Sequence, residues 1–213
     1  MLATDTFGSM LRLLLVRHGQ SEWNAEGRWQ GQADPPLSDL GRLRARAAGA
    51  RFGAVAAAVA SPLARGSPTA SAISESVGVG PVLVDADLME RHAGDWQGLT
   101  RAQIDQQFPG YLDDKGDDRR RPPGWEHDDV LLERVLRAID RIATDLAGAD
   151  DVVAVTHGGV IYAIEGHLGA DFQRIPNLGA RFVTVDATGR MALGERLLLV
   201  DPDEVLVTLP DQI

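Results

Sequence analysis

The chain of 213 residues contains no cysteine, which excludes disulfide bonds, thiol catalysis and cysteine-ligated metal sites. It also has no apolar run near the roughly 20 residues that a membrane-spanning helix needs. Its first residues lack the charged and then apolar layout of a signal peptide, so we expect a cytoplasmic protein. Positive charge is scarce, because 21 Lys and Arg face 31 Asp and Glu, for a net charge of −10. This balance argues against partners such as nucleic acid or an anionic membrane.

Internal repeats and linkers are absent too, and a chain of this length suits one domain with an ample core. We expect residues 1–10 to form a short N-terminal tail and residues 11–213 to form a single domain. Residues 111–124 are charged and rich in Gly and Pro, which is typical of a loop. We therefore expect a lid-like insertion near residues 91–125.

Two apolar runs end in a similar way. The run at residues 13–16 leads into Arg-His-Gly, and the run at residues 152–155 leads into Thr-His-Gly. Short apolar runs bounded by glycine are typical of buried parallel strands. Because ligands bind beyond the carboxyl ends of such strands, we expect His18 and His157 to meet there. Gly19 would let the backbone turn and bring its N–H close to an anion.

The remaining periodicity predicts an α/β fold, a three-layer α/β/α sandwich around a mostly parallel central sheet. Residues 25–36 are predicted to be loop. Further strands are predicted at residues 54–60, 82–84, 181–185 and 195–200, and helices at residues 38–52, from 63 onward, 99–108, 126–147 and 160–168. In the long helix, apolar residues at helical spacing should face the core, namely Val130, Leu131, Val135, Ile139, Ile142 and Leu146.

Four sequence blocks follow one another along the chain. They read LVRHGQSEWN at residues 15–24, QGQADPPLS at 30–38, SPLARGSPTA at 61–70 and LMERHAGDWQG at 88–98. In this order they resemble the signature of the histidine phosphatase superfamily, the phosphoglycerate-mutase-like proteins. The resemblance covers roughly residues 11–185 and departs at residues 66–68, where the family usually has Ala and Gln.

The resemblance implies a phosphomonoesterase that acts on a small phosphorylated metabolite and needs neither a metal nor a cofactor. His18 would be the nucleophile that forms a phosphohistidine, and Glu90 the general acid and base. Imidazole suits the first role, because it is nucleophilic near neutral pH when unprotonated. Arg17, Arg65 and His157 would complete the catalytic set by stabilising phosphoryl charge. Implied substrate-binding residues are Gly19, Asn24, Gln30, Gly31, Arg91 and Gly158.

The rim of the site is predicted to be aromatic and basic, formed by Trp23, Trp29, Arg91, Trp96, the Arg119–Arg121 run and Trp125. The remaining histidines show no close spacing of metal ligands, so we predict no metal site; they are His92, His127 and His167.

Two other functions stay open. A cofactor-dependent phosphoglycerate mutase shares the phosphohistidine, but this chain has Ala93 where mutases carry a substrate-contacting Tyr. A non-catalytic phospho-ligand binder would be expected to have lost His18 or Glu90, and both are present. Sugar phosphates, phosphoglycerate derivatives such as glucosyl-3-phosphoglycerate and a cobalamin precursor all remain candidate substrates. A homodimer is compatible with the sequence.

Overall fold

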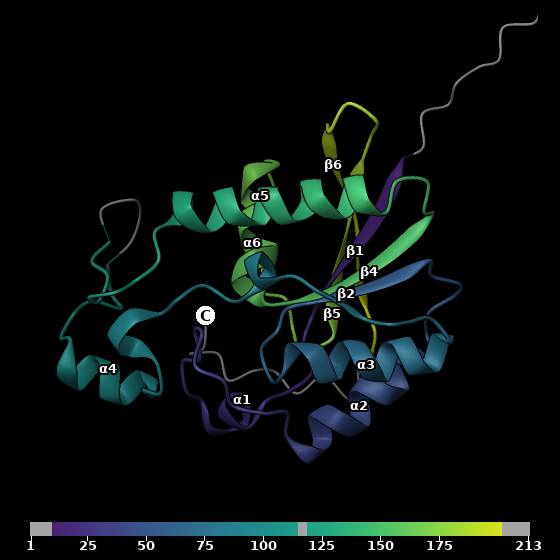
Figure 1. Ribbon diagram of the computed structural model, residues 1–213. Coiled ribbons are helices and arrows are strands. Elements are labelled where there is room, and N and C mark those ends of the chain that lie inside the picture. The colour runs from purple at the N-terminus through teal and green to yellow at the C-terminus, as the bar shows by residue number, and fades with distance from the viewer. Residues whose placement is uncertain (1–9, 115–118, 202–213) are drawn as a thin grey trace, which may run out of the picture.

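The computed structural model describes residues 10–114 and 119–201. Its core is a six-stranded sheet in the order β3-β2-β4-β1-β5-β6 (Figure 1). Strands β1 to β4 are mutually parallel where they pair, and β5 and β6 are antiparallel additions at one edge. The strands are β1 (Leu11–Arg17), β2 (Ala57–Ala60), β3 (Leu83–Val84), β4 (Asp151–Thr156), β5 (Gly179–Val185) and β6 (Met191–Leu198). The expected tail falls outside the described residues, except for Met10.

Helices cover both faces of the sheet, so the expected three-layer sandwich is confirmed (Figure 1). The helices are α1 (Glu22–Glu26), α2 (Asp39–Gly49), α3 (Gly66–Val77), α4 (Arg101–Gln107), α5 (Asp128–Asp145) and α6 (Gly158–His167), with 3-10 turns η1 (Ala86–Leu88) and η2 (Gly94–Trp96). Helices α2 and α3 lie on one face, and α5 and α6 lie on the other.

Strand β1 shows how the sequence builds this arrangement. Successive side chains of a strand point to opposite faces. Leu13 and Leu15 accordingly join the cluster under α5 and α6, whereas Leu14 and Val16 join the cluster over α2 and α3. Both faces are covered, which explains why the strand is a continuous apolar run instead of an alternating one.

Helix α5 corrects one expectation. Val130 is 52% exposed, so it does not belong to the core. Its neighbour Leu131 is fully buried. Successive residues of a helix are rotated by about 100° around the helix axis, so Val130 points away from the buried face on which Leu131 lies. The other predicted core residues are buried, apart from Leu146 at the helix end, which is partly buried.

Trp29 and the stretch between Arg91 and Trp125 share a small separate core, which we call the aromatic cluster. Its buried members are Trp29, Ala93, Trp96 and Ile104, and Leu99, Phe108, Tyr111, Leu112 and Trp125 pack against them. Helix α4 stands well away from the sheet on this side of the molecule (Figure 1). Residues 115–118 of the predicted loop lie outside the described residues.

Candidate functional site

Three strands deliver polar residues to one edge of the sheet. His18 follows β1, His157 follows β4 and Ser61 follows β2. The rings of His18 and His157 lie 5.0 Å apart between centroids, so the two histidines meet as predicted. Both are buried, and His157 lies deeper, with no exposed surface.

A cavity of about 620 Å³ opens at this edge. Eight of the predicted site residues line it, namely Arg17, His18, Asn24, Gln30, Gly31, Arg65, Glu90 and Arg91. The chain therefore brings these positions together from separate segments. His157 is not among the lining residues, since it sits behind His18.

The imidazole of His18 is held in one orientation. Its Nδ1 lies 2.6 Å from the carbonyl oxygen of Gly19. Because a carbonyl oxygen only accepts, Nδ1 carries the proton and Nε2 keeps its lone pair. Burial, followed by the positive charges of Arg65 and Arg17, lowers the pKa of His18 well below its usual value. The ring is thus neutral near pH 7 and available as a nucleophile.

The buried histidines predict a loss of stability on acidification. Burial, followed by Arg65, lowers the pKa of His157 well below 6.5, in the same direction as for His18. Below that pH the unfolded chain binds protons at these positions and the folded chain does not. The free energy of unfolding should therefore fall as pH drops through 6.5, by up to ~1.4 kcal/mol per pH unit for each ring.

Urea unfolding at about pH 8 and about pH 5 measures this loss. The His157→Gln variant should lose less stability between the two pH values than the wild type. The matched control is His167→Gln, which changes an exposed histidine of α6 and should lose as much as the wild type. Equal losses in all three proteins would contradict the buried neutral state of His157.

Two guanidinium groups face the cavity without a carboxylate ion pair among the described residues, and Arg65 is fully buried whereas Arg17 is partly buried. Arg65 donates to the carbonyl oxygens of Ala33 and Gly31 at 2.8 and 2.7 Å, and Arg17 donates to that of Ile175 at 2.6 Å. The Nε of each is buried and has no protein partner in this part of the chain. Burial lowers the pKa of Arg65 to about 10. Unpaired buried cations of this kind are suited to binding an oxyanion.

Glu90 reaches the cavity from the segment after η1. Its Oε1 accepts hydrogen bonds from the N–H groups of Arg91 at 2.8 Å and Gly159 at 3.1 Å. A Cβ atom on Gly159 would lie 2.3 Å from this oxygen, so glycine is needed at the start of α6 for the carboxylate to fit. The second glycine after His157 therefore has a steric role.

Two glycines that were predicted to bind substrate, Gly19 and Gly158, do not line the cavity. The N–H of Gly19 donates to Thr69 Oγ1 at 3.1 Å, and Gly19 does not line the cavity. A Cβ there would lie 3.0 Å from the carbonyl oxygen of Gly41, so Gly19 serves close packing against α2. Gly158 does not line the cavity either, and its neighbour Gly159 takes that place.

The predicted rim divides into two groups. Trp29, Arg91, Arg119, Arg121 and Trp125 line the cavity. Trp23, Trp96 and Arg120 do not line it. Trp96 is fully buried inside the aromatic cluster, and Arg120 pairs with Asp114 at 2.6 Å. The Trp23 ring lies beside Gly98, where an added Cβ atom would be 3.3 Å from Trp23 Cη2.

Several residues escaped the sequence analysis. Ser61 is fully buried, and its Oγ lies 2.8 Å from His157 Nε2. Ser61 is the first residue of the block at residues 61–70, and that position was the signal in the sequence that could have identified it. The opposite cavity wall comes from the start of α5, from α6 and from the segment that follows it, and includes Asp128, Leu132, Tyr162, Phe172 and Arg174. These residues carry no motif that marks them in advance.

Within residues 10–114 and 119–201, no group of three or more His, Asp or Glu side chains could hold a metal ion. The helices in the same part of the chain also include none that is long and apolar enough to cross a membrane.

Comparison with known proteins gives consistent matches. The model of the histidine phosphatase superfamily (branch 1) matches residues 13–187. A glucosyl-3-phosphoglycerate phosphatase of Mycolicibacterium vanbaalenii is 40% identical over 178 residues, which is 79% of each chain. A metal-independent phosphoserine phosphatase of Arabidopsis thaliana is 37% identical over 158 residues, 71% of this chain and 66% of the relative.

Solved structures agree with these matches. The mycobacterial glucosyl-3-phosphoglycerate phosphatase in complex with VO3 superimposes with a TM-score of 0.75 at 32% identity. The match covers 86% of this chain and 97% of that one.

Proposed function

The chain belongs to branch 1 of the histidine phosphatase superfamily, and on that basis we propose that its reaction passes through a phosphohistidine at His18. It is a phosphomonoesterase, like the related glucosyl-3-phosphoglycerate phosphatase and metal-independent phosphoserine phosphatase. The observation that carries the proposal is the pairing of a neutral His18, its Nε2 unprotonated, with the guanidinium groups of the buried Arg65 and the partly buried Arg17, which lack carboxylate partners among the described residues.

In the first half of the reaction, His18 Nε2 attacks phosphorus and the bond to the leaving oxygen breaks. Arg17 and Arg65 bind the non-bridging oxygens and stabilise their growing charge. His157, behind His18, adds a polar group to the same cluster. Glu90 gives its proton to the leaving alcohol.

In the second half, water attacks the phosphorus of the phosphohistidine. Glu90, now ionised, takes a proton from that water, and His18 leaves as the neutral imidazole. Inorganic phosphate is released and the starting protonation state returns. Transfer of the phosphoryl group to a monophosphorylated sugar acid, as in a mutase, requires contacts that Ala93 does not supply.

The leaving group has room and positive charge around it. The cavity of about 620 Å³ is far larger than a phosphate group, and Arg91, Arg119, Arg121 and Arg174 line it. Asp128 also lines it and pairs with Arg91 at 2.6 Å and with Arg119 at 3.7 Å, so the excess positive charge comes from Arg121 and Arg174. This charge favours a small phosphate ester whose alcohol part carries a carboxylate, as in the substrate that names the mycobacterial relative. We assign the described residues of the insertion, 91–114 and 119–125, as the lid-like wall of the site, to which Arg91, Ala93 and Trp125 contribute.

The Glu90→Gln variant tests the assignment of the general acid. An alkyl oxide leaves slowly without a proton, whereas a nitrophenoxide leaves readily. We expect kcat/KM for glycerol phosphate, which reports the steps up to departure of the leaving group, to fall by about 100-fold, and that for nitrophenyl phosphate to change much less. Initial rates of phosphate release at substrate concentrations well below KM are the measurement.

A matched control is Glu133→Gln, which changes an exposed carboxylate on α5 and should leave both rates unaltered. Equal losses on the two esters in Glu90→Gln would remove Glu90 from proton transfer. Rapid interconversion of 2- and 3-phosphoglycerate with 2,3-bisphosphoglycerate, without phosphate release, would favour the mutase instead.

A further inference from the structure

The guanidinium group of Arg134, on α5, donates hydrogen bonds to the segment that carries Glu90. Arg134 Nη1 donates to the carbonyl oxygens of Asp87 and Met89 at 2.6 and 2.7 Å, and Nη2 donates to that of Glu90 at 3.0 Å. The Nε and Nη2 groups also donate to Glu126, at 2.7 and 2.9 Å. All five N–H donors of this arginine are therefore satisfied within the protein.

Glu126 extends the same arrangement to the other side of Glu90. Its Oε2 accepts from the N–H of His92 at 3.0 Å, and its own N–H donates to the His92 carbonyl oxygen at 3.0 Å. Its carbonyl oxygen accepts from Arg91 Nη1 at 2.7 Å. Burial works against the charge of Glu126, but hydrogen bonds from Arg134 and His92 hold its pKa below the usual value. The Arg134–Glu126 pair is thus ionised and nearly buried, with 9% and 11% exposed side chains.

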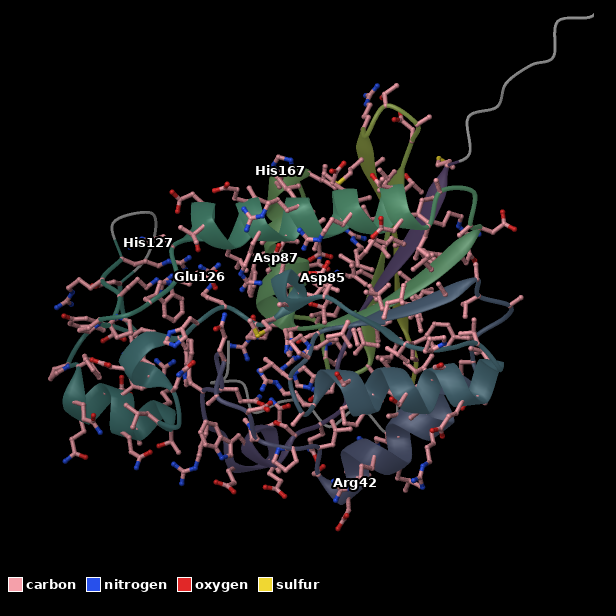
Figure 2. The ribbon with its side chains drawn as sticks, in the orientation of Figure 1. Arg42, Asp85, Asp87, Glu126, His127 and His167 are labelled. Carbon is pink, nitrogen blue, oxygen red and sulfur yellow. The ribbon has the colours of Figure 1, made fainter. Side chains whose placement is uncertain are left out.

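Two other arginines of α5 contact the same segment from the surface. Arg141 pairs with Asp85 and Asp87 at 2.8 and 2.7 Å, and Arg137 reaches Asp87 at 3.6 Å. Figure 2 shows Glu126, Asp87 and Asp85 one after another along α5. Arg137 and Arg141 are about half exposed, at 51% and 45%, so they bind in water and contribute little.

The carboxylate of Glu90 depends on this backbone for its direction. Its oxygens accept from the N–H groups of Arg91 and Gly159, and no side chain of the described residues donates to them. Its carbonyl oxygen is fixed by Arg134 and by Gln32 Nε2 at 3.1 Å. A small shift of the 87–92 segment would therefore move the proton donor away from the leaving oxygen, and such shifts are costly in catalysis.

We propose that Arg134, paired with Glu126, is a positioning residue for the general acid: it fixes the backbone of residues 87–92 and so aims the Glu90 carboxylate into the cavity. The inference rests on the proposed role of Glu90. It assigns to the buried pair an effect on proton transfer to the leaving group, separate from phosphate binding at Arg17 and Arg65.

The principal variant is Arg134→Lys, which keeps the charge beside Glu126. Its ammonium has three donors, so it cannot satisfy the five acceptor contacts now made. We expect kcat/KM for glycerol phosphate to fall by about tenfold or more, in the direction of Glu90→Gln, with kcat/KM for nitrophenyl phosphate affected much less. Inhibition by vanadate should stay as in the wild type, because the phosphate-binding residues are untouched.

The matched control is Arg137→Ala, another α5 arginine that contacts the same segment at the surface. It should leave both esters unaffected. A double variant provides the second control: in a Glu90→Gln background, Arg134→Lys should cause no further loss on the alkyl ester, since both changes act through one proton donor.

Several results would overturn the proposal. They are equal losses on both esters, no loss on either, weakened vanadate inhibition, or full additivity with Glu90→Gln. If Arg134→Lys does not fold, Glu126→Gln carries the same test, because it removes the charge that orients Arg134 while keeping a side chain of the same shape. Failure of Glu90→Gln itself to discriminate between the esters would instead refute the proposed role of Glu90 as the general acid.

Discussion

Replacing His18 with alanine should abolish turnover, with kcat reduced on the order of 10⁴-fold or more. His157 cannot take over, since it does not line the cavity and its Nε2 faces Ser61; His167 lines the cavity but is exposed on α6. The loss should be equal for alkyl and aryl phosphates, because both depend on the same attacking nitrogen. Steady-state phosphate release measures it.

His167→Gln is the control for this prediction, since His167 also lines the cavity but is an exposed residue of α6. It should retain the greater part of the activity. The fold of His18→Ala is checked by its urea unfolding curve. If His18→Ala kept as much as a tenth of the wild-type rate, the covalent route would be wrong.

The Arg65→Met variant should lose most of its affinity for phosphate and vanadate. Removing a charge-assisted pair from a desolvated site costs about 2–5 kcal/mol, which is at least a 30-fold rise in the inhibition constant. Arg65 has no exposed surface, so solvent does not weaken its interaction with a bound oxyanion. The inhibition constants of phosphate and vanadate are the measurement.

Arg65→Lys separates charge from geometry. It keeps a cation but cannot bond the carbonyl oxygens of Gly31 and Ala33 and a phosphate together, so its affinity should be intermediate. Arg46→Ala, which changes an exposed arginine of α2, should bind as the wild type does. Unchanged inhibition in Arg65→Met would remove this residue from the site.

The central strands and the meeting of His18 with His157 could be predicted because they depend on local patterns. A buried apolar run followed by His-Gly fixes both the strand and the edge where it ends. Helix α1 (Glu22–Glu26) was not predicted, and its end overlaps the start of the expected loop at residues 25–36; its five residues are held by a capping box between Ser21 and Asn24. Such a short helix leaves no periodicity to detect.

Contacts between distant segments could not be predicted. Arg134 and Glu90, whose carbonyl oxygen it binds, are separated by 44 residues in the sequence. An arginine at a polar position of a predicted helix gives no sign that its guanidinium group is buried. Among the four tryptophans, composition alone does not distinguish Trp96, which is fully buried, from Trp125, which lines the cavity. Packing of the aromatic cluster decides between them.

The most direct test of the account is to quench the wild-type enzyme during turnover of nitrophenyl phosphate and locate the trapped phosphoryl group by mass spectrometry. We expect one phosphoryl group on the peptide that contains His18, stable in base, labile in acid and absent from His18→Ala. A phosphoryl group on another residue, or turnover with none on the protein when hydrolysis of the intermediate limits the rate, would contradict the central claim.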